Sequence, residues 1–158
     1  MQSKQFEIGL STFERIRAAF PALAMKLDLH PAHLVLSMDI PAQPGLCFNV
    51  DLNLQNRDEL HLVASALWIE WFPCTNPERV DEYFEAVSGL LSGRFRIFEH
   101  WRGDRAVKAQ LQRPGKSGWN TIATSSKLLS VPWPQKSFKV VQNVPPVGPL
   151  PESDDQHH

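Results

Sequence analysis

The sequence predicts an α+β domain in which an antiparallel sheet of about six strands carries two helices on one face. Two segments have apolar residues at helical spacing, and each is followed by strand-length runs bounded by turn residues. The predicted order is α-βββ-α-βββ within residues 1–130, with a proline-rich tail over residues 131–158. With 42% hydrophobic and 21% charged residues, the composition is that of a globular chain rather than a disordered one.

The first helix is expected to begin at a capping box. Ser11 and Glu14 have the spacing at which each side chain accepts a hydrogen bond from the other residue's backbone N–H. Pro21 interrupts the apolar stripe that follows, which predicts a kink or two short helices. The stripe consists of Phe13, Ile16, Phe20, Leu23 and Leu27.

Three strands are expected next, at residues 33–40, 46–55 and 59–72. The middle one alternates most clearly, with Asn49, Asp51 and Asn53 on the face opposite to its large apolar residues. The third is apolar on both faces over much of its length, which predicts a central or doubly covered strand.

The second helix has clear start and stop signals. Asn76 is a preferred N-cap residue, Pro77 suits the first helical position, and Gly93 suits a left-handed C-terminal cap. Three shorter strands are expected after it, at residues 94–101, 106–112 and 119–124, joined by glycine-containing turns.

The tail is expected to have two parts. Residues 131–144 are predicted to dock in part, with residues 138–141 as an edge strand. Residues 145–158 contain four prolines and few large apolar side chains, so they are predicted to be extended.

The two helices also resemble each other. Glu14-Arg15-Ile16 and Glu78-Arg79-Val80 lie 64 residues apart, and either a degenerate αβββ duplication or the common pattern of amphipathic helices explains them. The order of elements resembles, in topology alone, that of the small type III secretion chaperones and some bacterial immunity proteins. Those chaperones usually end in another helix, where this chain has a strand and a tail, and no motif here is specific to either family.

Charge and cysteine content limit the partners and the compartment. The chain has 16 basic and 17 acidic residues, a net charge of -1, which gives no long-range attraction for phosphate backbones or anionic lipid. We therefore expect neither nucleic acid nor membrane as a partner. The lack of a signal-peptide pattern, together with only two cysteines, Cys47 and Cys74, predicts a cytoplasmic protein with free thiols.

The candidate site is the polar face of the predicted sheet. Its binding residues are expected to be Asn49, Asp51, Asn53, His61, Trp71 and Trp101. The sequence has no nucleophile elbow, no glycine-rich cofactor loop and no metal-ligand spacing, so neither cofactor nor metal is expected.

These features favour a non-enzymatic protein-binding module (adaptor, chaperone or immunity-type inhibitor) that binds another protein or itself through a sheet face or edge. One alternative is a small hydrolase or isomerase that uses Asp51 and His61 for acid–base chemistry. A second alternative is a structural subunit of a larger assembly.

Overall fold

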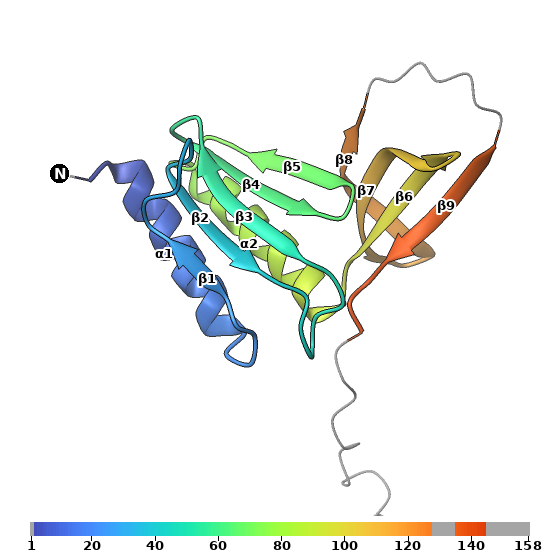
Figure 1. The fold of residues 1–158 in the computed structure, drawn as a ribbon, viewed down its shortest axis with the longest axis horizontal. Helices are drawn as coiled ribbons and strands as arrows, with labels where there is room; N and C mark the ends of the chain where they lie inside the picture. The colour runs from blue at the N-terminus through green and yellow to red at the C-terminus, as the bar shows by residue number, and fades with distance from the viewer. Residues whose placement is uncertain (1, 128–134, 145–158) are drawn as a thin grey trace, which may run out of the picture.

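A computed structural model of the chain describes residues 2–127 and 135–144. The described residues form two helices and two antiparallel sheets, so the α+β class is confirmed (Figure 1). The strand order is β1-β2-β3-β4-β5 in the first sheet and β8-β7-β6-β9 in the second. The prediction of one sheet of about six strands is wrong, because the strands divide between two sheets. The duplicated αβββ order is not seen either, since five strands separate the two helices.

The first helix, α1, spans Lys4–Ala19, and its N-cap lies eight residues, or about two turns, earlier than expected. Ser3 is its N-cap and accepts a hydrogen bond from the backbone N–H of Phe6, so the capping box at Ser11 is wrong. The helix ends before Pro21, which therefore terminates it instead of kinking it.

Five strands follow α1, and they form the first sheet. The last two of them replace the single strand expected over residues 59–72, because Ser65, with a φ of 52°, turns the chain between them. The strands are β1 (Lys26–Asp28), β2 (Leu36–Ile40), β3 (Val50–Gln55), β4 (Glu59–Ala64) and β5 (Leu67–Trp71).

The second helix, α2, spans Pro77–Ser92 and has the predicted ends. Asn76 accepts a hydrogen bond from the backbone N–H of Glu78, and Gly93 adopts the left-handed conformation with a φ of 82°. Both helices lie side by side on one face of the first sheet (Figure 1). The core between them and the sheet is apolar and contains Phe13, Ile16, Met38, Leu52, Leu62, Tyr83 and Leu90.

The second sheet follows α2. Its strands are β6 (Arg96–Arg102), β7 (Arg105–Gly115), β8 (Gly118–Ser126) and β9 (Lys136–Val141). β9 pairs with β6 at the edge, so the segment expected to dock at residues 138–141 is a strand. The expectations for residues 131–134 and 145–158 lie outside the described residues.

Gln142 and Asn143, which follow β9 and which we call the strap, connect the second sheet to the end of α2 and to the loop before β3. Asn143 is buried; its Nδ2 donates to the carbonyl oxygens of Gly45 (2.8 Å) and Leu91 (2.6 Å), and its Oδ1 accepts from the N–H of Cys47 (3.0 Å). Gln142 donates to the carbonyl of Gly93 (2.8 Å). Residues near the end of the described chain therefore hold the two sheets together.

Candidate functional site

The face of the first sheet that the helices leave uncovered is polar. The strand register brings Asp39, Asp51, Val63 and Trp68 into one row across β2 to β5. The next row contains Ser37, Asn53, His61 and Glu70. Since directly opposed residues in an antiparallel sheet share a face, these eight side chains all lie opposite to the helices.

His61 is at the centre of this face but is buried, with 4% of its surface exposed. Its Nε2 lies 3.0 Å from Oε1 of Glu59, and its Nδ1 accepts a 2.6 Å hydrogen bond from the indole Nε1–H of Trp68. An indole N–H only donates, so Nδ1 must be the unprotonated nitrogen and Nε2 must carry the proton. The ring is therefore held as one neutral tautomer with both nitrogens occupied.

Glu59 stabilises the other side of this imidazole. Hydrogen bonds from Asn56 and His61 hold the pKa of Glu59 below its ordinary value. Asn56 lies in the turn between β3 and β4 with a positive φ of 51°, and its Nδ2 lies 3.1 Å from Glu59 Oε1. The carboxylate thus accepts hydrogen bonds from both neighbours and stays ionised near neutral pH.

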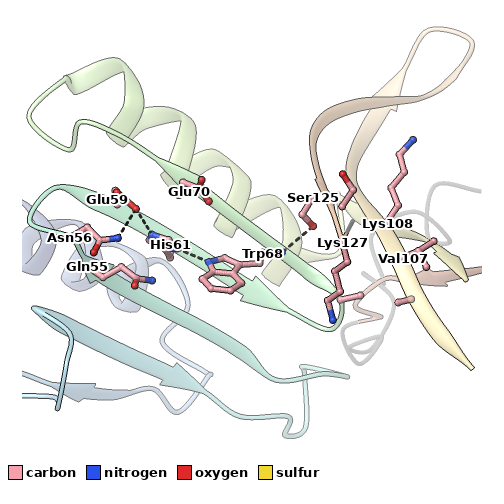
Figure 2. Close-up of a pocket in the computed structure, with 13 residues that line it drawn as sticks. Gln55, Asn56, Glu59, His61, Trp68, Glu70, Val107, Lys108, Ser125 and Lys127 are labelled. Atoms are coloured by element: carbon pink, nitrogen blue, oxygen red, sulfur yellow. Dashed lines mark hydrogen bonds and ion pairs between the residues drawn. The ribbon is translucent and has the colours of Figure 1, made fainter. Parts of the chain in front are cut away.

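Trp68 covers His61 and still has 56% of its surface exposed. Its backbone N–H donates to Oγ of Ser125 in β8 (3.3 Å), and its indole N–H donates to His61. Figure 2 shows Glu59, His61 and Trp68 joined in a chain, with Ser125 and Lys127 approaching from the second sheet. The hydrogen bond to buried His61 thus fixes the orientation of the indole, while much of the ring surface stays accessible.

A cleft of about 500 Å³ separates this face from the ends of β7 and β8. Glu59 and Glu70 lie on the wall formed by the first sheet, whereas Lys127 lies with Ser125 on the wall formed by the second (Figure 2). The cleft therefore presents opposite charges on its two sides with Trp68 between them.

A buried carboxylate fixes the position of the second wall. Glu99 of β6 is fully buried, and its Oε2 accepts hydrogen bonds from Ser65 Oγ (2.6 Å) and the N–H of Ala66 (2.9 Å). Its Oε1 accepts from Trp101 Nε1 (3.1 Å). Since Ser65 and Ala66 form the turn between β4 and β5, this carboxylate joins the two sheets beside the cleft.

A second polar feature lies farther along the same face. Asp39 and Asp51 are cross-strand partners and line a hollow of about 730 Å³ together with Lys26. Burial, followed by a hydrogen bond with Asp39 and the charge of Asp39, raises the pKa of Asp51 to about 6. Two carboxyl groups this close tend to share one proton.

Four of the six predicted site residues share one side of the sheet. Asn49 is exposed and accepts a hydrogen bond from the N–H of Ala42 (2.7 Å). Asp51 is half-buried, whereas Asn53 and His61 are buried rather than solvated. Asn53 accepts a hydrogen bond from Gln55 (3.1 Å).

The two predicted tryptophans do not join that group. Trp71 lies on the helix side of the sheet with its ring 5.5 Å from Tyr83, and Trp101 supports Glu99 from the second sheet. Trp68 is the aromatic residue of the cleft, and sequence reasoning did not select it. The polar residue Glu70, two positions along the strand, marks the face that Trp68 shares.

Comparison with models of known protein families gives no match, and no curated protein or solved structure is significantly similar to the chain. Within residues 2–127 and 135–144, no helix is long and apolar enough to cross a membrane. In the same ranges, no three histidine, cysteine or acidic side chains are grouped closely enough to hold a metal ion.

Proposed function

We propose that this chain is a non-enzymatic protein-binding module (an adaptor, chaperone or immunity-type inhibitor) that holds a segment of another protein in the cleft between its two sheets. The observation that carries the proposal is the exposed indole of Trp68, oriented by its hydrogen bond to buried His61. Tryptophan is enriched among the residues that dominate binding energy at protein interfaces. A ring held in place before binding loses little conformational entropy when a partner docks.

The environment of His61 favours binding over catalysis. Both imidazole nitrogens already have partners, and neither is directed at Asp51, which pairs across the strands with Asp39 and Val63. A general base needs a nitrogen that a substrate proton can reach. Using His61 in this way would require breaking its hydrogen bond to Trp68 or to Glu59.

The charges that line the cleft indicate which kind of partner segment it would bind. The carboxylates of Glu59 and Glu70 oppose the ammonium group of Lys127 across the cleft. A polypeptide segment with charges of both signs and an apolar side chain for Trp68 would complement these walls. Cys47 and Cys74 are both free thiols, which suits the reducing cytoplasm as the place where this function is performed.

The test compares the partner affinity of two alanine variants, Trp68→Ala and Phe72→Ala, with that of the wild type. The wild-type chain is used as bait in native lysate, and a captured partner is purified and its affinity measured by titration calorimetry. Trp68→Ala should weaken binding at least about tenfold. Phe72→Ala is the matched control, since Phe72 is 55% exposed but does not line the cleft, and it should leave the affinity within about threefold. Equal losses in both variants would contradict the proposal.

A second candidate function is acid–base catalysis at the Asp39–Asp51 pair. The specific observation is the raised pKa of Asp51, about 6, because a carboxyl pair that shares a proton can supply both an acid and a base. Chromogenic esters, glycosides and phosphate esters would serve as substrates for the wild type and for Asp51→Asn. Turnover that the variant abolishes would support this candidate, and no Asp51-dependent turnover of any of them would exclude these reaction classes.

A further inference from the structure

The net charge of the whole chain conceals an uneven distribution. Residues 1–93 contain six lysines and arginines against twelve acidic residues, whereas residues 94–144 contain ten against two, Glu99 and Asp104. Glu99 is fully buried, so its charge is withdrawn from the surface. The expectation against nucleic acid rested on the charge of the whole chain, and the second sheet taken alone is strongly basic.

The outer face of the second sheet collects several of these cations. The register places Arg102 opposite Lys136, His100 between Lys108 and Phe138, and Phe98 between Gln110 and Val140. We call this set, with Arg96 and its partner Gln112, the basic aromatic face; within the described strands it contains no acidic residue. It lies on the opposite side of β6 from Glu99 and therefore faces away from the cleft.

Aromatic rings are exposed among these cations. Phe138 has 61% of its surface exposed and stacks on Phe98, with ring centroids 5.4 Å apart and planes inclined by 20°. The ring of His100 meets both phenylalanines edge-on. The guanidinium of Arg96 lies 4.3 Å from the ring centroid of Trp119. The face thus offers exposed aromatic rings with positively charged side chains around them.

A hollow lies at the end of this face. Its volume is about 290 Å³, and the lining includes His100, Arg102, Lys108, Lys136 and Phe138. The volume is near the lower end of the range for small-molecule sites. An anionic group with an attached planar ring fits this combination of cations and aromatic side chains.

We propose that the basic aromatic face binds single-stranded nucleic acid. Unpaired bases stack on Phe138, and the backbone phosphates contact Arg102, Lys108 and Lys136. Proteins that bind single strands without sequence preference combine aromatic platforms with a positively charged track. A duplex keeps its bases stacked inside the helix, so the exposed rings favour a single strand over a double one. This inference uses a different surface from the cleft and does not depend on the proposed protein partner.

The experiment measures fluorescence anisotropy of a labelled oligothymidylate of about 20 nucleotides, and of a duplex of the same length, with the full chain. Single-stranded DNA should bind more tightly than the duplex. Phe138→Ala should weaken that binding about tenfold, since stacking on one base contributes that much, whereas Phe138→Tyr retains the ring and should bind nearly as the wild type. Phe72→Ala, just after β5 and outside the basic aromatic face, is the control and should have no effect.

Salt dependence tests the role of the cations. Binding should weaken steeply between about 50 and 200 mM salt, and the double variant Arg102→Gln/Lys136→Gln should reduce the log–log slope by roughly 1.4. Lys116→Gln in the turn between β7 and β8 removes a charge outside the face and should leave the slope nearly unchanged. Thermal melts of each variant check that it is folded.

Three results would overturn the proposal. One is an absence of single-strand binding at about 50 mM salt. Another is equal affinity for single strand, duplex and polyglutamate with no effect of Phe138→Ala, which indicates general attraction of polyanions. A third is salt-sensitive self-association that the Arg102→Gln/Lys136→Gln variant abolishes while DNA is not bound, which assigns the face to the acidic surface of a second copy.

Discussion

The indole Nε1 of Trp68 lies 2.6 Å from Nδ1 of His61, and this hydrogen bond joins a largely exposed ring to a buried one. The two residues come from adjacent strands of a hairpin and lie on its open face. Their rings are 5.9 Å apart and inclined by 52°, so the contact is directional rather than a stack. It determines both the tautomer of His61 and the orientation of Trp68.

We expect this hydrogen bond to be measurable as a coupling energy. Trp68→Phe removes the N–H donor and leaves Nδ1 of a buried ring without a partner, which should cost about 1–2 kcal/mol of unfolding free energy. A double-mutant cycle with His61→Ala, measured by urea denaturation, should give a coupling of at least about 0.5 kcal/mol. Trp119→Phe is the control and should change stability less. Additive effects of the Trp68 and His61 substitutions would show that the bond contributes nothing.

The Asp39–Asp51 pair predicts a pH-dependent stability. The pKa of Asp51 is raised from 3.8 to about 6 in the folded chain, so folding favours the protonated carboxyl. Its stabilising contribution is complete below about pH 3.8 and is lost as the pH rises through about 6. Above that pH the wild type carries a repulsive charge that Asp51→Asn removes.

The variant Asp51→Asn should therefore be more stable than the wild type at pH 7.5, by roughly 1 kcal/mol once solvent screening of a half-exposed group is allowed for. At pH 4 the difference should nearly vanish. Thermal melts across this range measure it, with Asp104→Asn in the exposed turn after β6 as the control. A difference that does not vary with pH would rule out the shared proton.

The hydrogen bonds of Glu99 are expected to stabilise the arrangement of the two sheets beside the cleft. Its carboxylate accepts from three donors in a buried position, and Glu99→Gln replaces one of those acceptor oxygens with an NH₂ group. We expect a loss of about 2–3 kcal/mol in denaturant unfolding, because hydrogen bonds to a charged acceptor are stronger than neutral ones. Glu70→Gln is the control on the exposed wall and should change stability by less than about 0.5 kcal/mol. Equal losses of stability in Glu99→Gln and Glu70→Gln would show that the hydrogen bonds of Glu99 do not stabilise the fold.

The sequence was informative where a local signal decides the structure. Asn76 and Gly93 predicted both ends of α2, and alternation along residues 50–55 predicted which side chains of β3 face the core. It failed at the turn of the β4–β5 hairpin, where Ser65 and Ala66 lack the glycine or proline that marks most turns. Local patterns also do not say which strands pair, so the division into two sheets was not predictable in this way.

The same limit of local patterns explains why the candidate site was predicted only in part. Alternation identified the polar face that carries Asp51 and His61, but the burial of His61 depends on Trp68, which comes from the next strand. Residues 59–72, interpreted as one strand with two apolar faces, do not indicate whether Trp68 or Trp71 is the exposed aromatic residue. Glu70 is the one local signal for the face of Trp68, and the structure shows that Trp68 and Glu70 share the open face while Trp71 packs on Tyr83.

The strap after β9 is expected to stabilise the fold through the side chain of Asn143. Asn143 makes three hydrogen bonds, to Gly45, Leu91 and Cys47, that no apolar side chain can replace. Asn143→Ala leaves the carbonyl groups of Gly45 and Leu91 and the N–H of Cys47 without this partner, so we expect a loss of about 2–4 kcal/mol. Asn120→Ala, at an exposed position, is the matched control and should change stability by less than about 0.5 kcal/mol.

Two truncations separate the strap from the residues that follow it. A chain that ends at Val144 keeps every hydrogen bond of Asn143, so its melting temperature should equal that of the full chain. A chain that ends at Val141 keeps β9 but loses Gln142 and Asn143, and it should melt at least about 5 °C lower because no less than about 2 kcal/mol is lost. Equal melting of the two truncated chains would show that the strap does not hold the sheets together. A large loss on ending at Val144 would instead mean that residues 145–158 pack against the domain or against a neighbouring subunit, as the assembly alternative requires.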